Sequence, residues 1–258
     1  MSYTEKQCAD LCRERDEVLA ELQSLMLEGV TQTRALTNAK LREHLDHGVA
    51  RRLNVLRRSI GRIFSLFPPT QERPLARETI EAVQIYLHAF VINLYGIFDN
   101  WAWAFALRHD LLAAIGYRTD VGLFKQKTQR FLPAALREYL VRQTMTDWHE
   151  TYLKEFRDAL VHRIPLYVPP ATWSTEDRQL YERLEDEKVR CIKTQQWEQL
   201  DKLWLEQDQI GKACPLFMHE FSGEPGARPL YLHPQLLCDG RAVVEFGKLY
   251  LATWHERG

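Results

Sequence analysis

Residues 147–170 read DWHETYLKEFRDALVHRIPLYVPP and hold the tightest group of chemistry-capable side chains in the chain. Asp147 followed three residues later by Glu150 is typical of a capping box, which predicts that a helix begins at Asp147. Large apolar residues then recur at every fourth position, as on the buried face of a helix: Trp148, Tyr152, Phe156 and Leu160. The prolines from Pro165 onward forbid its continuation. The sequence therefore predicts one helix over residues 147–162.

Arg157, Asp158 and His162 lie toward the end of this predicted helix. A guanidinium fork fits a phosphate bidentately, and an imidazole transfers protons near neutral pH. Asp158 and His162 are four residues apart and share a helix face, so the carboxylate is expected to orient the imidazole. Arg157 and His162 are about 140° apart around an ideal helix. Bringing both to one phosphate requires either a distorted last turn or a second chain that completes the site.

The run R157-D158-A-L-V-H162-R163 resembles the Arg-(four to six residues)-His motif of the HEPN superfamily. The resemblance covers the motif helix well and the preceding long helix loosely. It implies a small helical bundle, usually a homodimer in which the two motifs meet in one cleft. Many members are metal-independent ribonucleases of toxin–antitoxin, CRISPR-linked and phage-defence systems, so the resemblance implies no metal and no cofactor. The partners it implies are RNA, a second copy of the chain and an antitoxin or nucleotidyltransferase.

The resemblance gives each motif residue an expected role. His162 would be the general base or acid toward the ribose 2′-hydroxyl and the leaving 5′-oxygen, Arg157 would hold the scissile phosphate, and Asp158 would orient the pair. The expected product is a 2′,3′-cyclic phosphate, and Arg163 is a supporting basic residue. Two alternatives remain: a non-catalytic helical module that binds RNA or a partner, and a structural adaptor built around the segment between Trp173 and Trp204.

Composition indicates a helical protein of the cytoplasm. The chain has 258 residues, of which 45% are hydrophobic, and a formal net charge of −1. It has no run of 18 apolar residues and no apolar leader, so no membrane association is expected. Five scattered cysteines without a C-x-x-C spacing favour reduced thiols over disulfides or zinc. A near-neutral charge argues against coating nucleic acid by bulk electrostatics.

Two local runs of basic residues nevertheless suit a short RNA, because phosphate contacts supply most non-specific affinity. The alternative is that each run is only a solvated helix face. The candidate RNA-binding residues are Arg51, Arg52, Arg57 and Arg58 in the first run and Lys125, Lys127 and Arg130 in the second.

Apolar spacing predicts an all-α, HEPN-like bundle with four regions. Residues 1–70 are an N-terminal helical region, 71–170 the core with the motif, 171–233 an inserted helical arm with a possible hairpin, and 234–258 a C-terminal helix that packs back on the core. Within them we expect helices at about 4–28, 31–66, 75–115 and 235–254, and an arm that starts at Ser174 and is docked through Ile192, Trp197, Leu200, Leu203 and Trp204. Gly29 is expected to cap the first helix.

The helix predicted over 75–115 is apolar nearly all round, so it should be buried on several sides. Its length favours a break, either near Gly96 or around His109-Asp110. Asp99 and Asn100 are polar groups in these apolar surroundings and need partners. They are either satisfied core groups or residues that face the motif helix and support the site.

Overall fold

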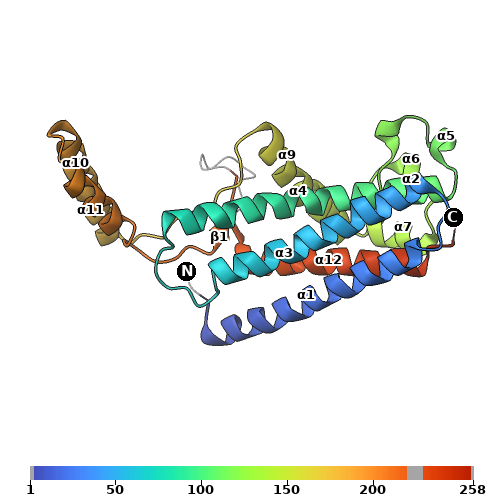
Figure 1. Ribbon diagram of the computed structural model, residues 1–258, viewed down its shortest axis with the longest axis horizontal. Coiled ribbons are helices and arrows are strands. Elements are labelled where there is room, and N and C mark those ends of the chain that lie inside the picture. The colour runs from blue at the N-terminus through green and yellow to red at the C-terminus, as the bar shows by residue number, and fades with distance from the viewer. Residues whose placement is uncertain (1–2, 220–228, 257–258) are drawn as a thin grey trace.

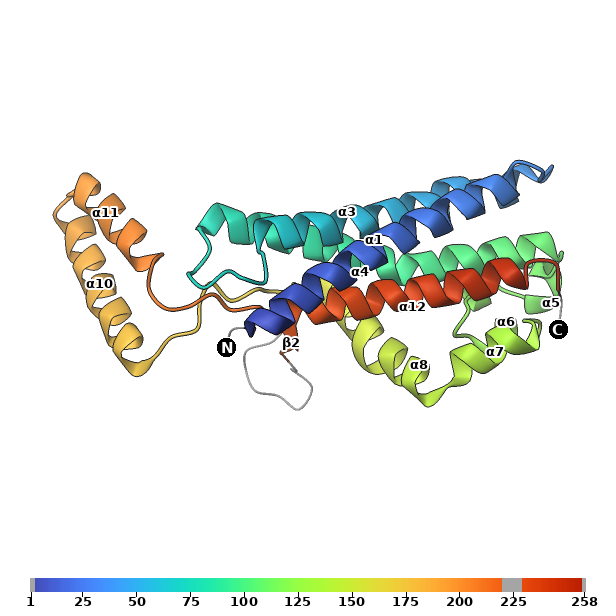
Figure 2. The ribbon, with the colours of Figure 1, turned by 90° about the horizontal axis from the view of Figure 1, so that it is seen from below.

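The computed structural model describes residues 3–219 and 229–256, and it is all-α apart from one small hairpin. Four long helices lie side by side: α1 (Glu5–Thr33), α3 (Ala50–Leu66), α4 (Arg77–Arg108) and α12 (Leu232–Ala252). The two views show the bundle and, set apart from it, a two-helix arm (Figures 1 and 2). The predicted helical class is confirmed.

One hydrophobic core joins the N-terminal, central and C-terminal regions. Its largest fully buried side chains include Trp101 on α4 and Tyr250 on α12, and Leu22 of α1 and Ile60 of α3 pack in the same cluster. Burying side chains of this size contributes about 1.5–3 kcal/mol each, so this shared core is the main source of stability. Described residues of the predicted regions 1–70, 71–170 and 234–258 therefore pack in one core.

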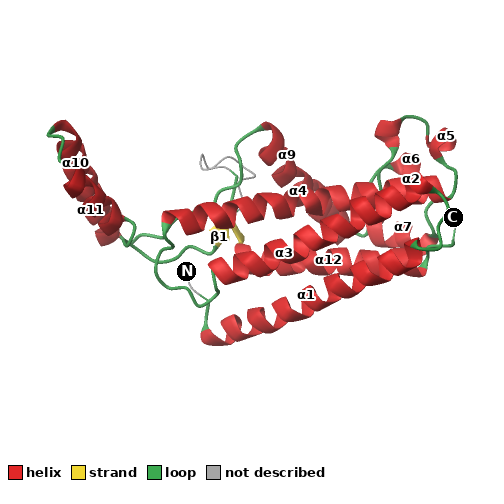
Figure 3. Ribbon diagram, in the orientation of Figure 1, coloured by secondary structure: helices red, strands yellow, loops and turns green. Residues whose placement is uncertain are grey.

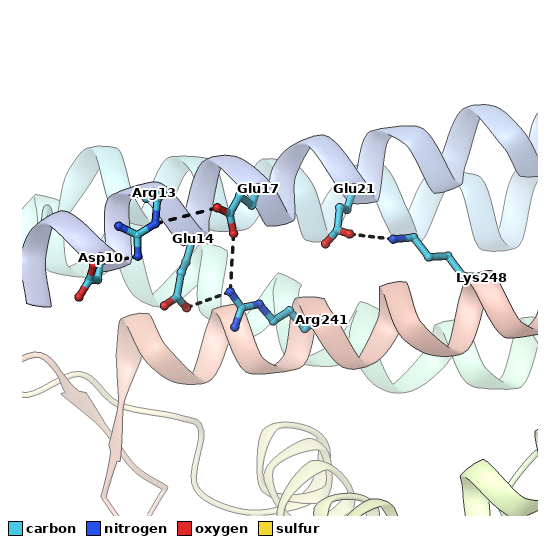
Figure 4. Close-up of polar contacts among 7 residues, drawn as sticks. All are labelled: Asp10, Arg13, Glu14, Glu17, Glu21, Arg241 and Lys248. Carbon is cyan, nitrogen blue, oxygen red and sulfur yellow. Dashed lines mark hydrogen bonds and ion pairs between the residues drawn. The ribbon is translucent and has the colours of Figure 1, made fainter.

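Exposed ion pairs add to the contact between α1 and α12 (Figure 4). The Arg241 guanidinium lies 3.1 Å from Glu14, and the Lys248 ammonium lies 2.7 Å from Glu21. Pairs at such exposed positions contribute at most about 1 kcal/mol each, so they adjust a contact that apolar packing creates.

The N-terminal half differs from its prediction in where helices begin and end. The Thr4 side chain caps α1, and the helix runs past Gly29 to Thr33, so the predicted cap at Gly29 is wrong. A short break precedes α2 (Ala39–Arg42), which continues through the π-helix η1 (Glu43–Val49) into α3. This π-helix includes Gly48, and glycine accommodates a change of backbone geometry easily because it has no Cβ.

Helix α4 ends where one of the two predicted breaks was placed. Asp110 has a φ of 52°, and the chain turns there into α5 (Leu112–Ile115). By length and composition α4 could span a membrane, and in this structure it is a packed helix of the bundle. The short elements η2 (Arg118–Asp120), α6 (Gln126–Gln129) and α7 (Ala134–Val141) then lead to the motif segment.

The motif lies on a continuous helix that begins earlier than predicted. It comprises α8 (Gln143–Asp147), the π-helix η3 (Trp148–Leu153) and α9 (Lys154–His162). Asp147 has helical angles and makes no cap bond, so the predicted capping box there is wrong. Its carboxylate instead accepts from the Gln143 side chain at 2.7 Å. The predicted end at His162 is confirmed.

The arm consists of α10 (Thr175–Lys193) and α11 (Trp197–Gln207), and the Ser174 cap is confirmed. Leu200 and Leu203 are buried in a separate small core, whereas Ile192, Trp197 and Trp204 are exposed, so their predicted docking is wrong. Strands β1 (Leu216–Phe217) and β2 (Leu230–Tyr231) form the antiparallel hairpin, coloured in Figure 3. Residues 220–228, which separate the two strands in the sequence, lie outside the described residues.

Candidate functional site

Tyr95 of α4 is the contact point between the central helix and the motif helix. The Arg157 guanidinium lies over its ring, 4.1 Å from the centroid. The imidazole of His149, on η3, stacks on the same ring with a centroid separation of 5.8 Å. Tyr95 therefore sets the positions of one cationic and one titratable side chain of the motif helix.

A cleft of about 350 Å³ opens beside Tyr95, and it is lined by both charges and rings. Asp99, Lys125 and Phe124 line it from α4 and from the loop before α6. The motif helix contributes His149, Glu150 and Lys154. The cleft therefore combines lysine and carboxylate groups with flat aromatic surfaces on which a base can stack.

Asp99 is the carboxylate at the centre of this charge cluster. Its side chain reaches solvent, but the atoms crowded around the carboxylate desolvate it and raise its pKa. Lys125, Arg157 and Arg52 oppose this by attracting the ionised form. Of the two polar residues predicted to support the site, Asp99 is thus the one on the side of the motif helix.

Arg157 is the motif residue with a defined environment. Its Nη1 lies 2.9 Å from the Asp158 carboxylate, and its side chain is about three-quarters buried, with 25% exposed. Its Nε is buried without a hydrogen-bond partner among the described residues. An external acceptor can therefore reach only the exposed part of this guanidinium, beside the Tyr95 ring that lines the cleft.

His162 lies on the exposed last turn of α9, away from the Tyr95 ring contacts. Asp158 bonds Arg157, and no hydrogen bond between Asp158 and His162 occurs among the residues that the structure describes. The Arg163 guanidinium pairs with Glu155 on the same helix. Within one chain, then, the arginine and the histidine of the motif are not brought together.

Asn100 faces the opposite side of α4. Its side-chain oxygen accepts from the Nε of Arg52 at 2.8 Å, and the Asn93 oxygen accepts from Nη1 of the same guanidinium at 3.0 Å. Asn100 is therefore a satisfied polar group at the contact with α3, which was the first of the two alternatives for it.

The remaining candidate RNA-binding residues fall into two groups. Arg51 and Arg58 are exposed on α3, while Arg57 bonds the Asn54 side chain. In the second run, Lys127 pairs with Asp120 at 2.8 Å and Arg130 bonds the carbonyl of Ala114 at 2.6 Å. Lys125, which bonds the carbonyl of Thr119, is the member of this run that lines the cleft.

His149 and Lys154 were missed in the sequence. Burial lowers the pKa of His149, while its hydrogen bond with Glu150, 2.9 Å long, acts in the opposite direction. Its ring also stacks on Phe124 at 3.7 Å. On an ideal helix His149 and Arg157 would lie about 80° apart, and the π-helix between them brings both to Tyr95. That π-helix has no signature in the sequence, so the pairing was not predictable.

No cluster of three or more histidine, cysteine or acidic side chains able to hold a metal occurs within residues 3–219 and 229–256. In comparisons with family models, curated protein sequences and solved structures, none matches the chain.

Proposed function

We propose that this protein is a metal-independent endoribonuclease whose motif resembles that of the HEPN superfamily. The observation that carries the proposal is the Arg157 guanidinium, which is one-quarter exposed and lies over Tyr95, a residue that lines the cleft. A phosphate diester accepts hydrogen bonds from the exposed part of such a fork and carries the charge that arginine prefers.

In the proposed reaction, His162 removes the proton of a ribose 2′-hydroxyl, and the 2′-oxygen attacks the neighbouring phosphorus. Arg157 stabilises the charge that develops on the phosphoryl oxygens, and the leaving 5′-oxygen takes a proton from an imidazolium. The products are a 2′,3′-cyclic phosphate and a 5′-hydroxyl. General acid–base catalysis of this kind contributes about 10²–10⁴-fold.

The site is proposed to form between two copies of the chain. The last turn of α9 is a regular α-helix to His162, so a distorted turn does not bring His162 to Arg157. Val161 and Ile164 beside His162 are apolar and more than half exposed, at 53% and 54%. Burial of these side chains against a second protomer would bring His162 of one protomer to Arg157 of the other.

The test is cleavage of single-stranded RNA in the presence of EDTA. His162→Ala and Arg157→Ala should each abolish cleavage and leave the helical content unchanged, while His255→Ala, at an exposed histidine near the C-terminus, should cut like the unaltered protein. Mixing the two inactive variants should restore activity, because a mixed dimer contains one site with both residues. Cleavage that survives His162→Ala removes this residue from the mechanism.

A second candidate is a non-catalytic module that binds RNA or a protein partner through the same cleft. The ion pair between Arg157 and Asp158 favours it, because within the described residues no hydrogen bond joins a carboxylate to His162. This candidate predicts a gel shift with RNA that requires Arg157, together with intact RNA after prolonged incubation. As an extension of the first proposal, we place the protein in the cytoplasm as a toxin or defence effector with an antitoxin or nucleotidyltransferase partner.

A further inference from the structure

A second polar pocket lies on the other side of α4, between α4 and the continuous helix of η1 and α3. It has a volume of about 470 Å³ and is lined by Arg51, Arg52, His44, His47, Asn93 and Asn100, with Glu43 and the apolar Val55 also on its wall. Two arginines against one carboxylate give this wall a net positive charge. The pocket shares no lining residue with the cleft beside Tyr95.

Arg52 is held in this pocket by neutral groups. Its Nε and Nη1 donate to the amide oxygens of Asn100 and Asn93, and these two bonds occupy two of the five guanidinium N–H groups. Two effects act on the pKa of Arg52. Burial is the larger and lowers this pKa, and the charge of Asp99 raises it. A buried arginine is usually paired with a carboxylate. Arg52 is instead oriented by two amide side chains, and its remaining N–H groups can donate to an external anion.

The amide of Asn100 also fixes the hydrogen position on His44. Because its oxygen accepts from Arg52, its nitrogen is the donor toward Nδ1 of His44, 3.4 Å away. His44 is then the tautomer with a hydrogen on Nε2, and burial lowers its pKa and keeps it neutral. The ring is stacked on Trp103 with a 6° angle between the planes, so its orientation is fixed. The pocket thus adds a neutral N–H donor to the guanidinium.

Two glycines make room for this arrangement. A Cβ on Gly96 would lie 2.5 Å from the carbon at the centre of the Arg52 guanidinium, and a Cβ on Gly48 would lie 2.6 Å from the Asn100 side chain. Any larger residue at either position would displace the group that it touches. The guanidinium therefore occupies space against α4 that only glycine at position 96 leaves open.

We propose that this pocket binds a phosphate group of a nucleotide or an RNA strand, with Arg52 as the main donor. A phosphate accepts several hydrogen bonds from donors in different directions, and the pocket offers guanidinium, imidazole and exposed arginine groups along the continuous helix of η1 and α3. Binding here does not rest on the proposed cleavage, because Arg157 and His162 lie on the motif helix.

The test uses calorimetric titration with two probes. Uridine 5′-monophosphate supplies a phosphate monoester, and a uridine trinucleotide without terminal phosphates supplies diesters only. Both the unaltered protein and Arg157→Ala are titrated, because the variant removes cleavage during the measurement and shows whether Arg157 contributes to binding. Binding of either probe that weakens with added salt supports the pocket and identifies the source of the phosphate. Failure of both probes to bind at millimolar concentration overturns the proposal.

Gly96→Ala is the decisive variant because it displaces the Arg52 guanidinium without changing any charge. Alanine is favoured over glycine within a helix, so helical content and melting temperature should be kept. We expect at least a tenfold loss of affinity for the probe that binds. Gly29→Ala is the matched control, since a Cβ there meets no atom within 4 Å, and its affinity should be unchanged. Equal binding by Gly96→Ala and the unaltered protein would refute the assignment to Arg52.

Discussion

The contact of Arg157 with Tyr95 makes the proposed phosphate site specific for a planar cation. A guanidinium stacks on an aromatic face and keeps its N–H fork directed sideways, whereas an ammonium has neither the plane nor the fork. Its position is further fixed by Asp158, which holds Nη1. Charge alone is therefore not sufficient at this position.

Arg157→Lys should consequently lower the rate of RNA cleavage about 10²–10³-fold, close to the effect of Arg157→Ala, as for loss of a donor to developing charge. Tyr95→Phe is the matched control, because it keeps the ring that carries the guanidinium and should cut at nearly the original rate. The measurement is the single-turnover rate on a short labelled RNA. A lysine variant that retains most of the activity would show that only the positive charge matters.

At the level of single residues, the spacing of Arg157, Asp158 and His162 identified them as a candidate site, and their role stays a prediction. In the structure, Arg157 lies near enough to Asp99 to lower the pKa of that carboxylate. Spacing did not point to His149, which stacks against Phe124 and Tyr95 from distant parts of the chain. It also assigned Asp158 to His162, although the neighbouring guanidinium is the stronger partner for a carboxylate.

The motif helix is tied to α12 by a buried carboxylate. Asp239 accepts hydrogen bonds from Trp148 and Tyr152 of η3, at 2.8 and 2.7 Å, and from Gln235 at 2.8 Å. These contacts explain why the helix passes through Asp147 without starting there: the aromatic residues that follow are held in helical register by another element. The capping signal at Asp147 is a local preference that this tertiary contact overrides.

Asp239 also gives this contact a pH dependence. Burial raises its pKa from 3.8 to about 6, so between pH 4 and 6 the folded state holds more protons at this site than the unfolded state. Stability contributed by Asp239 is therefore present at low pH and is lost as the pH rises toward 6. Burial of His233 lowers its pKa to about 4, which gives the opposite slope over the same range.

In Asp239→Asn, the pH dependence of stability that His233 causes should no longer be offset by Asp239. The amide keeps one oxygen as acceptor for Trp148 and Gln235, turns an NH2 donor toward the Tyr152 hydroxyl and no longer titrates. Acidification from pH 6.5 to 4 should therefore cost the variant about 2 kcal/mol more unfolding free energy than the unaltered protein. Urea unfolding at both pH values measures this difference. Equal losses in the two proteins would contradict a raised pKa at Asp239.

At the scale of the molecule, the long helices were predictable and the position of the arm was not. Apolar periodicity located α1, α3, α4 and α12 because each presents a broad face to one core. On α11 the same periodicity suggested docking of Trp197 and Trp204, yet these side chains are 58% and 47% exposed. Periodicity shows which face of a helix is apolar, and it does not show whether another element covers that face.

The arm is joined to the bundle at a narrow base, which predicts that it can be removed. Thr172 and Lys212 exchange two backbone hydrogen bonds, of 2.8 and 3.0 Å, so the two ends of the arm lie next to each other. Leu184, Leu200 and Ile210 pack in the arm's own core. Replacing residues 174–210 by a short Gly-Ser linker should change the unfolding free energy of the bundle by less than about 1 kcal/mol, a shift of about 2–4 °C or less in melting temperature.

Because the arm contributes no residue to the cleft beside Tyr95, the shortened protein should also cut RNA at the original rate. The control is the double variant Trp197→Ala and Trp204→Ala, which keeps the arm and removes two of its exposed apolar side chains. If both proteins cut normally, the arm is not needed for cleavage. Its exposed tryptophans would then suit a contact with another molecule. Loss of cleavage in the shortened protein alone, with its melting temperature kept, would instead make the arm part of the RNA-binding surface.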